Sequence, residues 1–234
     1  MKQTPLTALH RELGAKLVEF AGWEMPVSYP AGVMAEHKAA REGAALFDVS
    51  HMCQAELRGP RAAQALETLV PGGIKMLSDG KARYTYFTDP AGGILDDLIV
   101  TNTGDHLFLV LNAARRDHDL GHLRAGLAPD VEVVERTDLA LIALQGPQAE
   151  AVLSPLAAEA KALSFMQSTT AEIDGAPVRI SRLGYTGEDG YEISVPADAA
   201  QGLARRLLEA GAGPAGLGAR DSLRLEAGLP LYGN

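Results

Sequence analysis

The sequence predicts an α+β fold with mainly antiparallel sheets and packed helices. Two observations lead to this prediction. Short segments of alternating or continuous apolar residues are separated by glycine and proline turns, as expected for antiparallel strands. Segments with helical spacing of apolar residues follow these strands, and this order occurs twice along the 234 residues. A chain of this length can bury a sizeable core, in one large domain or in two interlocked ones.

The first half of the chain supplies most of the expected strands. Residues 4–20 are a short entry segment, and the Gly, Trp and Pro of 20–27 indicate a packed irregular loop. Helical spacing covers 32–43, 61–70 and 117–127. Strands are expected over 52–57, 83–88, 94–101, 106–112, 131–135 and 139–145, and 83–88 pairs with 94–101 as a hairpin.

The second half repeats part of this order. A helix opens after Gly146-Pro147 and runs to about residue 153, much as one follows Gly59-Pro60, which hints at an internal duplication. Strands over 178–183 and 191–195 flank a glycine-rich loop, 184–190. The remaining expected elements are a helix over 199–210, a flexible connection over 211–218 and a helix over 219–227.

Bulk properties exclude several classes of function. The net charge is −9 and the basic residues are dispersed, so nucleic acid is not an expected partner. No apolar run is long enough for a membrane span, and the N-terminus lacks a secretory signal, which predicts a cytoplasmic protein without a membrane partner. The single cysteine, Cys53, excludes an internal disulfide, and its alternating strand predicts a buried, inert thiol. No His or Cys cluster has metal-ligand spacing, so no metal is expected.

Two adjacent aspartates, Asp96 and Asp97, lie within the apolar strand 94–101. Strand alternation places them on opposite faces, and both faces are otherwise largely apolar, so burial on both sides is expected. Removing an ionised carboxylate from water costs several kcal/mol unless a partner or a shifted pKa compensates, which favours a chemical role for the doublet. The structural alternative is that one Asp accepts backbone N–H groups or pairs with Arg83.

The other motifs give weaker evidence of function. Gly211, Gly213 and Gly216 fit G-x-G-x-x-G, but the preceding segment is helical rather than a strand, so this match is interpreted as a loop. No nucleophile elbow or catalytic triad is present among the serine and histidine patterns. The role of His51 stays open, and structural roles are expected for the other histidines, His10, His37, His106, His118 and His122.

Six stretches together resemble one family, the aminomethyltransferase (T-protein) of the glycine cleavage system. The first three are Glu-Phe-Ala-Gly-Trp-Glu-Met-Pro at 19–26, Phe-Asp-Val-Ser-His-Met at 47–52 and Gly-Gly-Ile-Leu-Asp-Asp-Leu-Ile-Val at 92–100. The others are Gln-Gly-Pro at 145–147, Gly-Tyr-Thr-Gly-Glu-Asp-Gly-Tyr-Glu at 184–192 and Gly-Leu-Gly-Ala-Arg-Asp-Ser-Leu-Arg-Leu-Glu-Ala at 216–227. They occur in the family's order over almost the whole chain.

This resemblance implies a reaction and a domain plan. The reaction transfers a one-carbon unit from the aminomethyl-lipoyl arm of a partner, the H-protein, to tetrahydrofolate as acceptor substrate, with release of ammonia. The implied architecture is two interlocked ferredoxin-like, folate-binding domains. The first contains 1–52 plus 137–218, and the second contains 53–136 plus 219–234. Family chains continue into a C-terminal β-barrel, which this sequence is expected to lack.

The resemblance also implies site residues. Asp97 is the implied catalytic residue, and its carboxylate also contacts folate. The implied folate-binding residues are Met52, Tyr84, Asp97, Val110, Tyr185, Glu192 and Arg220. Each has a structural alternative: Tyr84 and Val110 are also ordinary strand residues, and Arg220 could pair with a nearby acid such as Asp221 or Glu226. One departure is Thr101, where relatives often carry an aromatic residue.

Two alternatives share the folate chemistry. One is a non-catalytic folate-binding module of the iron–sulfur assembly type, which carries a Lys-Gly-Cys motif that this sequence lacks. The other is the folate part of a flavin amine oxidase, which has a dinucleotide-binding domain before it. The intact pair of Asp96 and Asp97 and the start of the chain favour the transferase.

Overall fold

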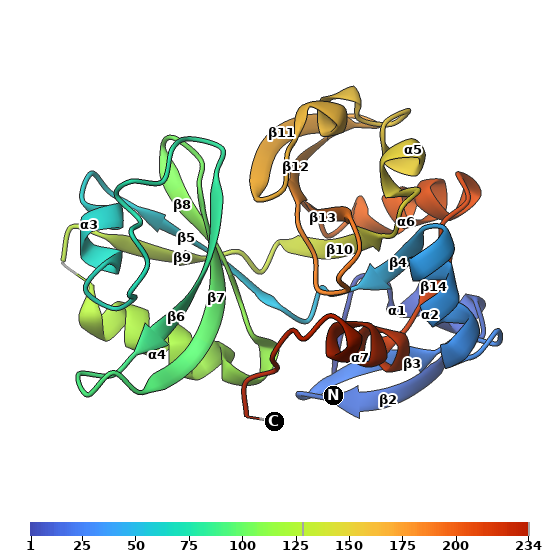
Figure 1. The fold of residues 1–234 in the computed structure, drawn as a ribbon, viewed down its shortest axis with the longest axis horizontal. Helices are drawn as coiled ribbons and strands as arrows, with labels where there is room; N and C mark the ends of the chain where they lie inside the picture. Colours follow the sequence, from blue (N-terminus) through green and yellow to red (C-terminus); the bar gives the residue numbers. More distant parts are fainter. Residues whose placement is uncertain (128, 234) are drawn as a thin grey trace. The chain divides into compact units, whose positions relative to one another are not determined.

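A computed structural model describes residues 1–127 and 129–233, and these residues form two compact units (Figure 1). Unit 1 contains the described residues of 1–51, 138–165 and 169–234, and unit 2 contains those of 52–137 and 166–168. The predicted α+β class is confirmed. No helix of the described ranges is long and apolar enough to cross a membrane.

The larger sheet of unit 1 is mixed. Strand β10 (Leu139–Gln145) lies near its centre, between antiparallel neighbours β13 (Gly190–Pro196) and β4 (Ala45–Asp48). Its order is β11-β12-β13-β10-β4-β14, where β11 is Gln167–Ile173, β12 is Ala176–Arg182 and β14 is Gly213–Ala215. Strand β14 is parallel to β4. The apolar run of β10 is explained by its central position, because all of its residues after Leu139 are buried.

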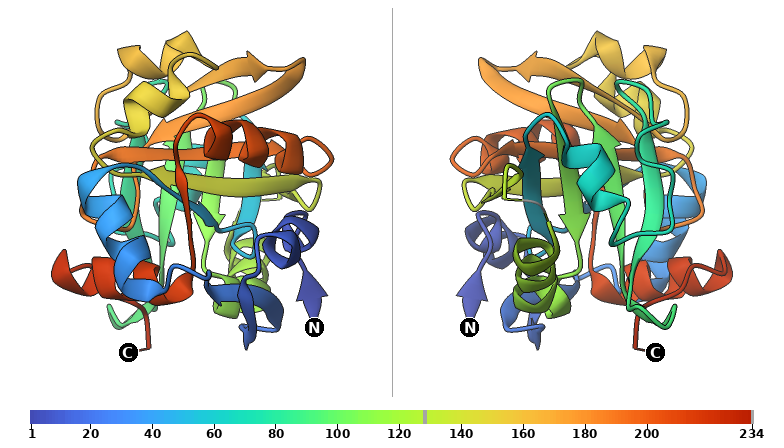
Figure 2. Two further views of the ribbon diagram at one scale, coloured as in Figure 1. Left: turned by 90° about the vertical axis from the view of Figure 1, so that its right-hand side faces the viewer. Right: turned by 90° about the vertical axis from the view of Figure 1, so that its left-hand side faces the viewer.

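Helices pack against the larger sheet and complete the hydrophobic core of unit 1. Leucines and alanines of α6 (Ala200–Glu209) pack with residues of β10 and β13, as do residues around α1 (Thr7–Glu12) and α5 (Ala149–Leu153). In Figure 2 (left), α6 runs in about the same direction as β10 and β13. A 3-10 turn, η2 (Ala158–Ala162), adds the buried Ala160.

A small sheet and two helices complete unit 1. The sheet has the order β1-β3-β2, where β1 is Lys2–Gln3, β2 is Lys16–Phe20 and β3 is Trp23–Ser28. Helix α7 (Leu217–Glu226) packs against both β3 and α2 (Val33–Glu42). This helix belongs to unit 1, whereas the family resemblance implied that 219–234 belong to the second domain.

Unit 2 is built on an antiparallel sheet with helices on one face. Its order is β6-β7-β8-β5-β9, with β6 at Ala82–Thr88, β7 at Ile94–Asn102, β8 at His106–Leu111, β5 at Cys53–Arg58 and β9 at Glu132–Glu135. Apolar residues of α3 (Ala62–Leu66) and α4 (Arg116–Gly126) pack on the same face (Figure 2, right). A 3-10 turn, η1 (Ala113–Arg115), connects β8 to α4.

The predicted hairpin of unit 2 is confirmed. Strands β6 and β7 are antiparallel neighbours, and the register places Tyr86 opposite Asp97 and Tyr84 opposite Ile99. Asp89 stabilises the connecting turn, because its Oδ1 accepts hydrogen bonds from the backbone N–H groups of Ala91 and Gly93, both at 2.8 Å. A local turn motif thus sets the register of the strand that carries the aspartate doublet.

Both units have the same junction where a central strand leads to a helix. Gly59 follows β5 and Gly146 follows β10, with φ of 133° and 128°. A Cβ at Gly59 would collide with the carbonyl oxygen of Asp130, and one at Gly146 with that of Gly43. Only glycine fits these turns without strain. The internal duplication itself stays a prediction.

Two sequence predictions for unit 1 are wrong. Residues 20–27 are not an irregular loop, because β2 and β3 form a hairpin there. Pro26 is tolerated because β1 pairs with β3 only at Trp23 and Glu24, so β3 has a single neighbour at the proline. Residues 211–218 are likewise not a flexible connection, since they contain β14 and the start of α7.

Candidate functional site

The aspartate doublet of β7 faces two different environments. Asp96 is fully buried on the face of Leu98 and Val100, which belong to the core of unit 2. Asp97 is half-buried on the opposite face, as is Ile99. The expectation that the strand is buried on both faces is therefore correct for the Asp96 face and wrong for the Asp97 face. Asp97 is therefore the more accessible of the two carboxylates.

Asn112, directly after β8, links the two aspartates. Its side-chain Nδ2 donates to Asp97 Oδ1 at 2.6 Å and to Asp96 Oδ1 at 3.0 Å. The Tyr84 hydroxyl donates a second side-chain hydrogen bond to Asp97. The rings of Tyr84 and Tyr86 stack edge to face, with centroids 5.1 Å apart. Asp97 is thus held by donors from the two strands on either side of β7.

Two opposing effects set the proton affinity of Asp97. Burial raises the pKa of Asp97 and the charge of Asp96 raises it further, whereas hydrogen bonds from Tyr84 and Asn112 lower it. The net pKa of Asp97 is raised. Burial and the charge of Asp97 also raise the pKa of Tyr84, so its phenol stays neutral and remains a donor. The Asp97 carboxylate therefore has a higher affinity for a proton or a developing cation than an exposed Asp has.

The sheet register brings two more predicted residues to this region. Val110 on β8 lies opposite Ile99, which in turn lies opposite Tyr84 on β6. Tyr84, Val110 and Asp97 therefore share one face of the sheet, with Val110 half-buried. Met52 precedes β5 and is also half-buried. The structure brings these four predicted residues into the same unit, on or next to its sheet.

Three predicted residues lie in unit 1. The Arg220 guanidinium, on α7, lies 4.7 Å from the ring centroid of Tyr185. Burial raises the pKa of Glu192 on β13, and the positive charge of Arg220 partly opposes that rise. Arg220 does not pair with Asp221 or Glu226, which bond to other side chains. Tyr185, Glu192 and Arg220 therefore lie near one another in unit 1.

Arg220 retains unused hydrogen-bonding capacity. Its Nη1 is buried and has no hydrogen-bond partner within the described part of the chain. A buried, unpaired guanidinium N–H is costly, and it is the type of donor that binds a carboxylate or carbonyl oxygen of a ligand. Together with the Glu192 carboxylate, it offers one donor and one acceptor to a polar heterocycle.

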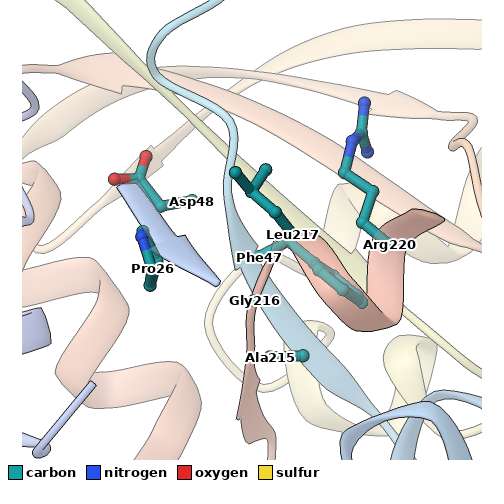
Figure 3. A pocket seen from close by; sticks show the side chains of 7 residues that line it. All are labelled: Pro26, Phe47, Asp48, Ala215, Gly216, Leu217 and Arg220. Atoms are coloured by element: carbon teal, nitrogen blue, oxygen red, sulfur yellow. The ribbon is translucent and has the colours of Figure 1, made fainter. Parts of the chain in front are cut away.

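A small pocket of unit 1 adjoins Arg220 (Figure 3). Its empty volume is about 160 Å³ with open solvent included, which is less than the 300–1,000 Å³ typical of small-molecule sites. In the view of Figure 3, Asp48 and Arg220 extend on opposite sides of Leu217. The lining residues are Pro26, Phe47, Asp48, Ala215, Gly216, Leu217 and Arg220.

Asp48 at this pocket is already satisfied by the protein. Its Oδ2 accepts from Thr4 Oγ1 at 2.6 Å and lies 2.8 Å from His10 Nε2, whose other ring nitrogen lies 2.9 Å from the Tyr29 hydroxyl. Asp48 and His10 are both buried. This network closes the N-terminal segment onto β4, which agrees with the structural role expected for His10.

Burial shifts the pKa values of two further groups. Burial lowers the pKa of His51 to about 4, and the nearby charge of Arg220 also lowers it, so His51 is neutral at pH 7. Burial raises the pKa of the Cys53 thiol to about 12, as expected for an unreactive core cysteine. No three His, Cys, Asp or Glu side chains among residues 1–127 and 129–233 are placed to hold a metal ion.

Sequence reasoning missed Asn112 and Asp119. Asn112 was hidden at the end of the apolar run of β8, where its position as the first polar residue was the available signal. Asp119 is fully buried on α4 next to Leu120 and near Leu123, so an acid on the apolar face of a helix was its signal. Neither signal identifies Asp96 as the partner, because the contact joins separate elements.

The sequence and the structure were compared with known proteins. Residues 6–234 match the family described as the GCVT N-terminal domain. The chain is 49% identical over 237 residues to an aminomethyltransferase of Rubrobacter xylanophilus, and 45% identical over 251 residues to a mitochondrial aminomethyltransferase of Dictyostelium discoideum. Both alignments cover 100% of this chain, but only 63% and 62% of those relatives.

A solved structure has the same fold. The crystal structure of glycine cleavage system aminomethyltransferase T from Bartonella henselae is similar with a TM-score of 0.92 and 43% sequence identity. The similarity covers 100% of this chain and 64% of that chain. The chain therefore spans less than two thirds of the length of each of these three relatives.

Proposed function

Because the chain belongs to the family of GCVT N-terminal domains, we propose that it contains the folate-binding and catalytic part of a glycine cleavage aminomethyltransferase. The proposed reaction moves a one-carbon unit from the aminomethyl-dihydrolipoyl group of H-protein to tetrahydrofolate and releases ammonia. Aminomethyltransferases that are 49% and 45% identical over the whole chain support this proposal. The proposed partners are lipoylated H-protein and the folate substrate, without a metal, and the proposed compartment is the cytoplasm.

Asp97 is the proposed catalytic residue. Over the whole reaction, two bonds of the transferred carbon break, C–S to leave the dihydrolipoyl thiol and C–N to release ammonia, while two bonds to folate nitrogens form. Cationic iminium character develops on the transferred carbon as the C–S or C–N bond breaks. A carboxylate of raised proton affinity in a partly dry environment can stabilise that charge and orient the attacking amine. Tyr84 and Asn112 hold the carboxylate in one orientation, which lowers the cost of assembling the transition state.

The other proposed binding residues offer complementary contacts. Tyr84, Met52 and Val110 supply apolar and aromatic surface for a flat ring system. Glu192 is proposed to accept hydrogen bonds from the amino and ring N–H groups of the pterin. Arg220, with its unpaired Nη1, is proposed to donate to an oxygen of the ligand, while Tyr185 stacks beneath its guanidinium.

A single observation carries the proposal: Asp97 is the half-buried member of an aspartate pair, with a raised pKa and two fixed donors. The test is to titrate tetrahydrofolate into the wild-type chain and the Asp97→Ala variant, and to measure H-protein-dependent turnover. The variant is expected to bind tetrahydrofolate within about threefold of wild type and to lose turnover by a factor of about 10² or more.

Asp105→Ala is the matched control, because the Asp105 side chain is exposed in the turn between β7 and β8. Equal turnover of wild type and Asp97→Ala would refute the assigned role. Folate binding without any turnover in the wild-type chain would instead support the alternative, a non-catalytic folate-binding module of the same fold.

A further inference from the structure

Two buried carboxyl groups meet in the core of unit 2. Asp96 extends from β7 and Asp119 from α4, and neither side chain is exposed to solvent. The two carboxyl groups share a hydrogen bond. Asp96 Oδ2 and Asp119 Oδ2 receive no hydrogen bond from any N–H or O–H donor of the described residues. A proton shared between the two carboxyl groups is the physical way to satisfy this arrangement.

Burial, and after it the neighbouring aspartates, keep Asp119 neutral. Burial raises the pKa of Asp119 to about 9, and the hydrogen bond to Asp96 and the charges of Asp96 and Asp97 act in the same direction. Arg115 opposes the rise, and His118 Nδ1 lies 3.0 Å from Asp119 Oδ1. At pH 7 the Asp119 carboxyl therefore keeps its proton and can donate a hydrogen bond to Asp96.

The pair is connected to the proposed site through one amide. Asn112 Nδ2 has two hydrogens, and both are used: one toward Asp96 Oδ1 at 3.0 Å and one toward Asp97 Oδ1 at 2.6 Å. The bond from the amide to Asp96 Oδ1 is strongest while the Asp96 carboxylate is ionised. Asp96 can remain an ionised acceptor in an apolar core only if another group compensates its charge by donating to it.

We propose that Asp119 is a positioning residue, which donates a hydrogen bond to Asp96 and thereby fixes Asn112 against the Asp97 carboxylate. Asp119 does not touch the substrate; it acts through Asp96 and Asn112. Its effect on turnover rests on the proposed transferase function, whereas the carboxyl pair and the amide contacts do not. The two parts of the inference can therefore be tested separately.

Two substitutions separate the donor role from the charge. In Asp119→Asn the amide can donate the same hydrogen bond but cannot ionise, and in Asp119→Leu no donor remains. Asp117→Asn and Asp117→Leu are the matched controls, because Asp117 is exposed on the same helix. Three readouts apply: the infrared band of a neutral carboxyl at pH 7, the Asn112–Asp97 distance in crystals, and kcat with KM for tetrahydrofolate.

The neutral-carboxyl band is expected in wild type and both Asp117 variants, and is expected to be lost in Asp119→Asn. Crystals of Asp119→Asn are expected to retain the Asn112–Asp97 bond, and those of Asp119→Leu to lose it. For turnover, Asp119→Leu is expected to lower kcat at least tenfold with KM within twofold of wild type. Asp119→Asn is expected to restore kcat to within about twofold of wild type.

A wild-type chain without the neutral-carboxyl band, or a band of undiminished intensity in Asp119→Asn, would overturn the inference. So would an unchanged Asn112–Asp97 distance in Asp119→Leu, or equal kcat values in the Leu and Asn variants. If the wild-type chain shows no turnover, the proposed function fails, and the spectra and crystals still decide whether Asp119 positions Asn112.

Discussion

The two faces of the five-stranded sheet in unit 2 use the same residue type for different purposes. On the helix-covered face, Asp96 is fully buried and is accompanied by a second acid, Asp119. On the other face, Asp97 is half-buried and is held by a phenol and an amide. Under the proposed function, the more accessible Asp97 is the catalytic residue, so burial of a carboxyl group alone would not identify it.

Asn112 is the connection between the faces. It follows β8, at the level where β7 places its two aspartates, and it donates to both of them. Substitutions are therefore expected to differ in their effects on stability and turnover. The effects differ between the buried face of Asp96, Asn112 itself and the open face, which carries Asp97 and Tyr84.

The largest effect is expected for the pH dependence of stability. An unfolded Asp has a pKa near ~3.9, whereas the folded pKa of Asp119 is raised to about 9. The folded state therefore holds the extra proton between these values, so stability is fully present below ~3.9 and is lost as pH rises toward 9. Between these pH values, the free energy of unfolding of wild type, measured with urea, is expected to fall by on the order of 1 kcal/mol per pH unit more than that of Asp119→Asn. Parallel pH profiles of the two proteins would contradict a proton on the buried pair.

Asn112→Ala breaks the connection between the faces. Hydrogen bonds to charged groups contribute about 1.5–3 kcal/mol each, so kcat is expected to fall roughly 10- to 100-fold as Asp97 loses its fixed orientation. Steady-state turnover with H-protein and tetrahydrofolate measures the loss. Asn102→Ala is the control, because Asn102 at the other end of β7 donates to the Leu77 carbonyl and has a structural role. A similar loss of turnover in both variants would indicate a general disturbance of the sheet.

Tyr84→Phe changes only the open face. The Tyr84 hydroxyl lowers the pKa of Asp97, so its removal is expected to raise that pKa. Protonation of Asp97 would then begin at higher pH, and the acid limb of the pH–turnover profile is expected to shift upward. Loss of one hydrogen bond of about 1 kcal/mol corresponds to a decrease in kcat of about fivefold. An acid limb that does not move would argue that Asp97 is not the titrating group.

The smallest effect is expected for the stability of Asp97→Asn. The raised pKa of Asp97 means that its ionised form is disfavoured in the folded protein. The amide removes this cost and can still accept from Asn112, but solvent screening at a half-buried position keeps the gain below about 1 kcal/mol. Urea midpoints at pH 7 measure it, and a loss of stability would show that Asp97 is structural rather than a functional site maintained at a cost.

Local sequence patterns predicted much of the fold, and they predicted that the two aspartates lie on opposite faces of their strand. The turn signal at 89–93 and the apolar strands on either side predicted the β6–β7 hairpin, which the structure confirms. Strand alternation predicted that Asp96 and Asp97 point to opposite faces. The hairpin at β2 and β3 was missed because glycine and proline within it resemble a loop. Pro26 is tolerated there because the pairing of β1 with β3 ends before it.

The sequence by itself determined the family, the α+β class and the aspartate doublet, because these depend on motifs and on the two-residue period of a strand. Only the tertiary structure decided that Asp119 and Asn112 meet the doublet, and which aspartate stays accessible. Helix α4 brings Asp119 to Asp96 through the packing of Leu120 and Leu123 in the core, and strand register brings Asn112 to Asp97. Such contacts join separate elements, so the physical reason lies in long-range packing that no local periodicity contains.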